Sequence, residues 1–305
     1  MALDVSAITG YVKANEKTLV AKSILGAKTL SIVKFQPEVK GSAAINVLVD
    51  AVTLQAGGCG WNPAGTTTLS KRVITTGLFK VNEALCEKTL AGTYAEWGLN
   101  IAVGRETLPF EEVISDTKVK GIQKSVELLA WNGNTTGNTS TYLDVTNGYV
   151  KIIGDASGVI DATVSGKTLS GDTIYAIDKI VAALPNEIIA ESDLVVFVGQ
   201  EILRSYITAY NASNQFAGTL MLNGADLSVI IPNTGIKLQG VAGLNGKNKA
   251  YASTASNFIA GGDINGSESM FELFYSQDNR EFRFAVDFNI GFQVAFPEFI
   301  VKYTI

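Results

Sequence analysis

The stretch that decides the fold is residues 282–296 near the C-terminus, FRFAVDFNIGFQVAF. Every even position in it is apolar: Phe282, Phe284, Val286, Phe288, Ile290, Phe292, Val294 and Phe296. The odd positions are polar or small, so the pattern has a period of two, which predicts a strand with one buried face. At ~3.3 Å per residue this strand is about 50 Å long, whereas most strands have ~5–6 residues. An ordinary small domain has no place for such an element.

The residues on either side of this strand also indicate extended structure. Pro297 follows directly, and it ends the strand because proline has no backbone N–H to donate to a sheet. Residues 298–305, EFIVKYTI, then predict a final apolar strand, and MFELFYS at 270–276 predicts a short strand upstream.

Residues 109–131, PFEEVISDTKVKGIQKSVELLAW, contain the strongest helix pattern. Pro109 suits a first helical turn, and Glu111 and Glu112 favour the positive end of the helix dipole. Asn132-Gly133 is a typical helix end. Apolar residues fall on one face at helical spacing: Phe110, Val113, Ile114, Ile122, Val126 and Leu129. The helix is expected to be about 33 Å long.

Two extended segments flank a glycine-rich turn nearer the N-terminus. Residues 42–56 and 69–81 are rich in apolar and β-branched residues, and GGCGWNPAGTTT lies between them. Glycine and Asn-Pro are typical of turns, so this region predicts a long hairpin. Residues 6–30 before it predict a helix or an arm, and EALCEKTL at 83–90 after it predicts a short helix.

The middle of the chain, residues 166–265, predicts a compact α/β unit. DLVVFVGQ at 193–200 is an apolar run typical of a buried strand, and a helix is expected directly after it. Another helix is predicted before Pro185, and GYVKII at 148–153 predicts a short strand. The long hairpin, helix and strand do not fit one globule. We therefore expect a flat subunit that completes its burial against neighbouring molecules.

Composition narrows the classes of function. The chain has 305 residues, a net charge of −5 and 17% charged residues, against ~25% in a typical soluble domain. Its mean hydropathy is +0.21, yet no apolar run reaches the ~18–20 residues of a membrane helix, and the N-terminus has no secretory pattern. The lysines of residues 1–40 are scattered, which predicts a solvated helix face rather than a phosphate-binding cluster.

The absence of histidine removes the usual nucleophile systems and His-ligated metal sites. Cys59 and Cys86 are too few for a structural zinc site, and we expect both to be reduced. Two Ser-x-x-Lys matches, Ser31 to Lys34 and Ser115 to Lys118, have the spacing of a Ser-Lys nucleophile, but the motifs that accompany such a pair are missing.

Two ligand-binding motifs are incomplete. SGKTLSGD at 165–172 resembles part of a phosphate loop, but Asp161 stands where the first glycine belongs. GGDINGSES at 261–269 resembles the start of a calcium loop, but its twelfth ligand position would be Phe274. Both segments are better explained as turns, so no cofactor or metal is expected.

The order of these elements resembles the major capsid proteins of tailed phages, which have the Hong Kong 97 fold that encapsulin shells also use. The resemblance rests on the helix ending LLAWNGN, the strand and helix in DLVVFVGQEILRSYI, and the alternating strand that runs into VAFPEFIVKYTI. It implies an α+β subunit divided as follows: an N-terminal arm, 1–32; an extended loop, 41–77; a peripheral domain, 33–40 and 78–165, with a spine helix at 109–131; an axial domain, 166–265; long strands of the peripheral domain, 266–297; and a last axial strand, 298–305.

The resemblance also implies a function. The chain is expected to be a structural protein and not an enzyme, forming hexamers and pentamers of an icosahedral head around double-stranded DNA, without sequence-specific contacts and without a membrane. Scaffolding, portal and decoration proteins would be separate partners, and the product would be a virion assembled in the bacterial cytoplasm. An encapsulin-like shell is the alternative, followed by a β-rich binding protein or a Ser-Lys hydrolase.

The candidates for subunit contacts are Trp61, Asn62, Pro63, Lys71 and Arg72 in the loop, and Glu111 and Glu112 on the spine helix. Some relatives join a loop lysine to an asparagine of a neighbour with the help of a glutamate, and Lys71 and Asn279 are the corresponding candidates here. The long strand carries no glutamate, and Glu281 lies beside Arg283, which would neutralise it as a base. The sequence therefore predicts a shell without this cross-link.

Overall fold

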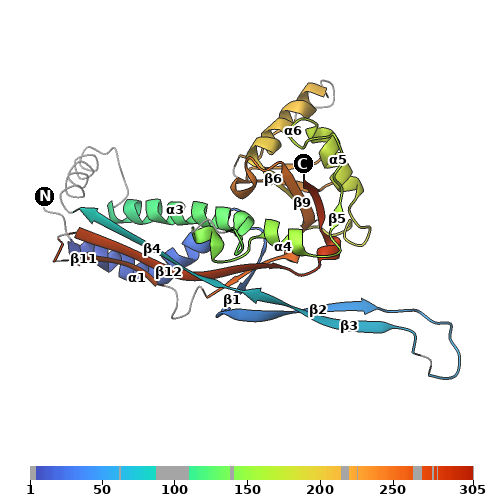
Figure 1. Cartoon of the computed structure of the whole chain (residues 1–305), viewed down its shortest axis with the longest axis horizontal. Coiled ribbons are helices and arrows are strands. Elements are labelled where there is room, and N and C mark those ends of the chain that lie inside the picture. Colours follow the sequence, from blue (N-terminus) through green and yellow to red (C-terminus); the bar gives the residue numbers. More distant parts are fainter. Residues whose placement is uncertain are drawn as a thin grey trace.

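A computed structural model describes residues 5–61, 63–86, 110–137, 141–213, 220–224, 226–263, 270–276, 278–279 and 281–304. Figure 1 shows an elongated molecule in which a long sheet and a compact sheet lie side by side. The hairpin of β2 (Ser42–Ala51) and β3 (Thr66–Thr75) projects away from both sheets. The prediction of a long hairpin in this part of the chain is confirmed.

The long sheet is built around β12 (Glu281–Val294), the strand predicted from the period-two pattern. β4 (Gly77–Cys86) pairs antiparallel with β12 along ten positions, and β11 (Met270–Ser276) pairs with its other edge. β10 (Phe258–Gly262) continues that edge and pairs with β1 (Lys34–Pro37). The even-numbered side chains of β12 from Phe282 to Val294 are all buried, which confirms the predicted face.

Two helices cover this buried face of the long sheet. α1 (Val5–Leu25) packs against β11 and against α3 (Phe110–Asn132), which matches the predicted spine helix to within one residue at each end. The buried side chains of α1 and α3 recur at helical spacing and join one core with the sheet: Val12, Leu19, Val20 and Ile24; Val119, Ile122, Val126 and Leu129. Residues 5–25, expected as a helix or an arm, are therefore helical.

The compact sheet has six strands in the order β5 (Ile160–Asp161), β13 (Val301–Thr304), β9 (Lys249–Thr254), β6 (Leu194–Gly199), β8 (Lys237–Val241), β7 (Ser228–Ile230). β6 is buried along its whole length, as predicted. Its Val196 and Val198 belong to the core shared with α5 (Thr173–Ala182) and α6 (Gln200–Ser213). Its Val195 and Phe197 belong to the core shared with α3. The compact sheet is therefore covered on both faces.

Four single-turn helices lie between these elements, and two of them mark sharp changes of direction. η1 (Tyr142–Asp144) precedes α4 (Tyr149–Asp155), η2 (Ala242–Leu244) follows β8, and η3 (Ala255–Asn257) separates β9 from β10. η4 (Pro297–Phe299) begins at the predicted proline break and separates β12 from β13. η3 and η4 thus carry the chain from one sheet to the other.

Two local predictions are wrong. GYVKII was expected as a strand but lies in α4, where Tyr149 and Ile153 are buried four residues apart, a helical spacing. Residues 83–86 were expected to begin a helix but belong to β4, because β12 offers them an edge to pair with from Glu281 to Phe284. Backbone pairing with a long neighbour outweighs the helix propensity of Glu, Ala and Leu.

The two sheets also divide the chain differently from the expected domains. β10 lies within the range expected for the axial domain but pairs with β1 and β12 of the long sheet. β5 lies within the range expected for the peripheral domain but pairs with β13 of the compact sheet. The remaining strands of the compact sheet are β6, β7, β8 and β9 from the middle of the chain, and β13, which follows Pro297.

Candidate subunit interfaces

The root of the hairpin is anchored to the body by a small apolar core. Val47 and Ile74 of the hairpin are buried against Ile259 of β10, together with Val39 and Ala295. Gln293 of β12 donates a hydrogen bond from Nε2 to the Val73 carbonyl, 2.8 Å away. The lower half of the hairpin is therefore fixed by its own subunit.

A polar group lies beside this apolar root. The buried Asp263 carboxylate forms an ion pair with Lys40 Nζ at 3.5 Å. The backbone N–H of Asp263 donates a hydrogen bond to Asn289 Oδ1. Asn289 Nδ2 in turn donates to the Val39 carbonyl at 3.4 Å. These bonds connect β12 and the end of β10 to the segment that enters the hairpin, so they fix its direction of exit.

The outer half of the hairpin exposes large apolar side chains. Leu48 and Leu69 lie opposite each other in the β2–β3 register and are 58% and 72% exposed. Leu54 and Trp61 near the tip are 98% and 92% exposed. We call Leu48, Leu54, Trp61 and Leu69 the apolar hairpin surface. A monomer gains nothing from exposing these side chains, and large apolar side chains gathered on one projecting segment indicate an interaction site.

The candidates in the loop all lie on this hairpin. Trp61, Pro63 and Lys71 are exposed, and Arg72 is half-buried. Asn62 lies outside the described residues. Cys59, at the same tip, is an exposed thiol without a disulfide. The five candidates remain predictions as subunit contacts, because the described chain is a single copy.

Of the two candidate glutamates of the spine helix, the structure describes the side chain of Glu112. Glu112 is half-buried at the start of α3 and lies near Tyr11 of α1. Burial, with the charges of Glu112 and Asp116, raises the pKa of the Tyr11 hydroxyl. The side chain of Glu111 lies outside the described residues. Glu112 therefore has a neighbour on α1 of its own subunit, in addition to the helix dipole.

The residues considered for a cross-link lie in two places. Asn279 Nδ2 donates to Glu281 Oε1 at 3.4 Å, so the β11–β12 turn brings these two side chains together. Arg283 Nε lies 3.0 Å from the same Glu281 oxygen, which confirms that this carboxylate has a cationic partner. Lys71 is on β3, and Figure 1 shows the hairpin at the opposite end of the molecule from this turn. Lys71 therefore cannot reach Asn279 and Glu281 of the same subunit.

The Ser-x-x-Lys pairs do not form a nucleophile and base. Ser31 Oγ donates to the Lys28 carbonyl at 2.8 Å, and Lys118 Nζ pairs with Glu83 of β4. Ser115 is buried in α3. No group of acidic or cysteine side chains suited to a metal ion occurs among the described residues. No helix in the described part of the chain has the length and apolar character to cross a bilayer.

The two sheets meet at an aromatic cluster that the sequence did not predict. Trp131 at the end of α3 is fully buried, and its ring centroid lies 5.2–6.3 Å from four other aromatic rings. These are Tyr149 of α4, Phe197 of β6, Tyr251 of β9 and Phe258 of β10. We call these five residues the Trp131 cluster. It joins the long sheet, the compact sheet and the spine helix in one core.

A buried carboxylate supports this cluster. Glu127 of α3 accepts hydrogen bonds from the Thr29 backbone N–H at 2.8 Å and from its hydroxyl at 2.6 Å. Trp131 Nε1 donates to the same hydroxyl at 2.7 Å. Burial raises the pKa of Glu127, and burial together with the Glu127 charge raises the pKa of Tyr149 well above its usual value. The segment after α1 is thus held to the spine helix by hydrogen bonds that lie out of water.

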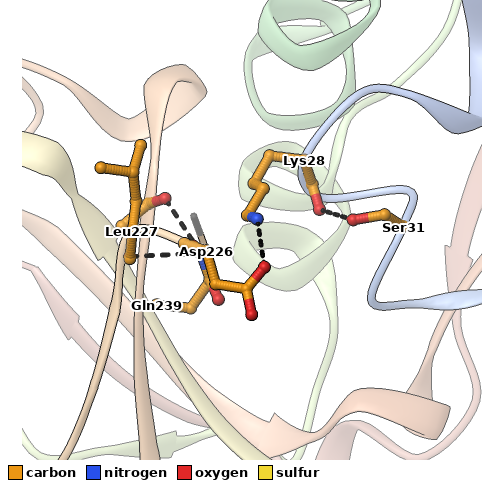
Figure 2. A network of polar contacts seen from close by, with 6 residues as sticks. Lys28, Ser31, Asp226, Leu227 and Gln239 are labelled. Atoms are coloured by element: carbon orange, nitrogen blue, oxygen red, sulfur yellow. Dashed lines mark hydrogen bonds and ion pairs between the residues drawn. The ribbon is translucent and has the colours of Figure 1, made fainter. Parts of the chain in front are cut away.

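The N-terminal segment also contacts the loop before β7 of the compact sheet, as Figure 2 shows. Lys28 Nζ lies 3.0 Å from Asp226 Oδ1, and this ion pair lowers the pKa of Asp226. Gln239 of β8 donates from Nε2 to the Asp226 carbonyl at 2.6 Å and holds that loop in place. Both charged side chains are partly exposed, so the pair contributes little energy compared with the buried Trp131 cluster.

Comparison with solved structures relates this architecture to known proteins. A chain of the satellite phage P4 procapsid superposes with a TM-score of 0.63 at 13% identity, over 94% of this chain and 90% of that chain. This chain has a phage capsid fold. The capsid of an empty GTA particle matches it with a TM-score of 0.56 at 10% identity, over 93% of this chain and 90% of that chain.

The capsid fold also occurs in a virus-like particle from Pyrococcus furiosus, which matches with a TM-score of 0.53 at 9% identity, over 94% of this chain and 96% of that chain. No protein-family model and no curated protein matches the sequence. The resemblance to Hong Kong 97-type capsid proteins is confirmed at the level of the fold, and identities this low show the fold alone.

Proposed function

We propose that this chain is the major capsid protein of a phage. In this proposal it assembles into hexamers and pentamers that close into an icosahedral head around double-stranded DNA. The apolar hairpin surface is the observation that carries the proposal. It lies beyond the body of its own subunit, and its burial by a neighbouring copy would remove the exposed apolar area from water. The phage capsid fold supports the same assignment.

The proposed subunit is a structural protein with no catalytic site. Its N-terminal segment, extended loop, and peripheral and axial domains are proposed parts of a capsid subunit. The loop residues Trp61, Asn62, Pro63, Lys71 and Arg72, and Glu111 and Glu112 of the spine, are the proposed contacts with other copies. Scaffolding, portal and decoration proteins are proposed as separate partners, and the virion as the final location after assembly in the bacterial cytoplasm.

Electron microscopy of the expressed chain tests the proposal directly. We expect capsomers, tubes or closed shells, formed by the chain alone or together with a scaffolding protein. A chain that stays a 32.3 kDa monomer at high concentration in every condition tested would refute the assignment.

An encapsulin-like shell is the second candidate, because the Pyrococcus furiosus virus-like particle is matched over 96% of its chain. Particles purified from phage-producing cells distinguish the two. Nuclease-protected double-stranded DNA inside the particle supports the phage head, and an enclosed protein without protected DNA supports the encapsulin-like shell.

The shell is further expected to lack covalent links between subunits. Glu281 already pairs with Arg283, so it is poorly placed to act as a base for Asn279. Boiled particles should give one band near 32 kDa on a denaturing gel. A ladder of multiples that persists with reductant would contradict this prediction, and its loss in a Lys71→Ala variant would identify the lysine.

A further inference from the structure

Lysines dominate the exposed charges of the helical layer. Among the described side chains of α1 and α3, every charged residue in the exposed class is a lysine, and the acids Glu16, Glu112 and Asp116 are half-buried. We call this surface the lysine face, and its lysines are Lys13, Lys17, Lys22, Lys120 and Lys124. The whole chain has a net charge of −5, so this local excess runs against the overall balance.

The packing of two helices produces this surface. Lys22 of α1 and Lys120 of α3 line one shallow groove between the helices, together with the half-buried Asp116. Gln123 Nε2 of α3 donates to the Lys22 carbonyl at 2.8 Å, so the two helices are held in register there. About one hundred residues separate the two lysine groups in the sequence. For this reason the lysines of the N-terminal region appear scattered when the sequence is read alone.

None of these lysines is neutralised within the described chain. The ion pairs of the described residues involve Lys28, Lys40, Lys118, Lys151, Lys167, Arg283 and Lys302 as the cations. Lys13 and Lys17 are one helical turn apart, as are Lys120 and Lys124, and like charges at this spacing repel and weaken a helix. An external anion over the lysine face would remove this repulsion.

The opposite face of the long sheet has a different charge pattern. Lys80 of β4 lies across from Asp287 of β12 in the register, and Arg283 pairs with Glu281. Glu272 of β11 is exposed on the same side. Arg283 and Lys80 on this face therefore have acidic neighbours within the sheet, unlike the exposed lysines of α1 and α3.

We infer that the lysine face is the inner surface of the shell and contacts the phosphate backbone of enclosed double-stranded DNA. This inference rests on the proposed function, since only a closed shell has an inner surface. Lysine is a flexible point charge that attracts phosphate without reading base sequence. Each subunit would repeat the same surface, so many weak contacts would add over the shell.

A charge-neutral variant tests the DNA contact. Lys13, Lys17, Lys120 and Lys124 are changed together to Gln, which has a helix propensity close to that of lysine. The control variant changes Lys34, Lys80, Lys179 and Lys247 to Gln, four exposed lysines on other surfaces. Both variants shift the net charge equally, so a difference between them reports the position of the lysines and not their number.

The measurement is the affinity of the soluble full-length chain for a 30-base-pair duplex as a function of salt. Each phosphate contact contributes about −0.9 to the slope of log K against log salt, so the lysine-face variant should lose about 3–4 from the wild-type slope. The control should keep the wild-type slope. Equal slopes in all three proteins would overturn the inference. It would also be overturned if the lysine-face variant bound DNA normally but no longer assembled, because that result would indicate a protein partner.

Labelling of assembled particles tests the side of the shell. A lysine-reactive reagent coupled to a carrier protein too large to enter the shell should modify Lys80 in intact particles but leave Lys13 and Lys120 unmodified until the particles are opened. Modification of Lys13 and Lys120 in intact particles would refute the inner location, while the particles themselves would still support the proposed function.

Discussion

Trp131→Ala is expected to lower the free energy of unfolding by about 3–5 kcal/mol, the usual cost of truncating a fully buried tryptophan. It should also separate the unfolding of the two sheets. Trp131 contacts Phe197 and Tyr251 of the compact sheet and Phe258 of the long sheet, so the cavity opens where the two halves share one core. Calorimetry should show two heat-absorption peaks in the variant where the wild type has one.

Phe271→Ala is the matched control for this prediction. Phe271 is also fully buried, but it lies within the long sheet, where its ring centroid is 5.0 Å from that of Phe284. This variant should lose a comparable amount of stability and keep a single transition. If both variants unfold in one transition, the coupling of the two sheets does not depend on the Trp131 cluster, and the prediction is wrong.

The second large effect is expected on assembly. Leu48→Ser together with Leu69→Ser should leave the melting temperature of the subunit nearly unchanged, because both side chains are mostly exposed in the single chain. Burying a leucine contributes about 1.5–3 kcal/mol, and 1.4 kcal/mol corresponds to a tenfold change in an equilibrium constant. The two side chains are 58% and 72% exposed, so their burial by a neighbour is worth roughly 2–4 kcal/mol, and the protein concentration needed for assembly should rise by at least about twentyfold, as measured by light scattering.

Two further variants sharpen this test. Val145→Ser with Ile189→Ser removes two exposed apolar side chains from other surfaces and should assemble like the wild type. Deletion of residues 55–66 removes the tip but leaves Leu48 and Leu69, and it should also spare the subunit fold and impair assembly. Equal loss of subunit stability and assembly in these hairpin variants would show that the hairpin serves its own subunit and not a neighbour.

The elements predicted best were those whose sequence pattern is repeated many times. β12 alternates without a break along its length, and α3 keeps one apolar face over about six turns, so a local reading of either pattern locates its buried side. The hairpin was also predicted, since valine-rich segments flank a glycine-rich turn. Short elements carried too few repeats: GYVKII fits a strand and a helix about equally until the packing of Tyr149 and Ile153 decides for the helix.

The features that could not be predicted depend on contacts between distant segments. Residues 83–86 form a strand only because β12 pairs with them from the far end of the chain. The Trp131 cluster draws its rings from five separate elements, and Trp131 gave no signal of its own beyond its place in LLAWNGN. The ion pair of Glu281 with Arg283 was predicted because the two residues are neighbours on one strand, whereas the surroundings of Glu112 depend on α1.

The shared core of the two sheets has a mechanical consequence. A joint between the sheets would let a subunit adapt its shape by bending, but the Trp131 cluster makes the plate stiff across this boundary. The elastic compliance of the subunit is then concentrated in the outer part of the hairpin, beyond the apolar core of Val47 and Ile74 that anchors its root. Shells of different curvature would then contain the same rigid two-sheet body, and the outer part of each hairpin would bend to a slightly different angle.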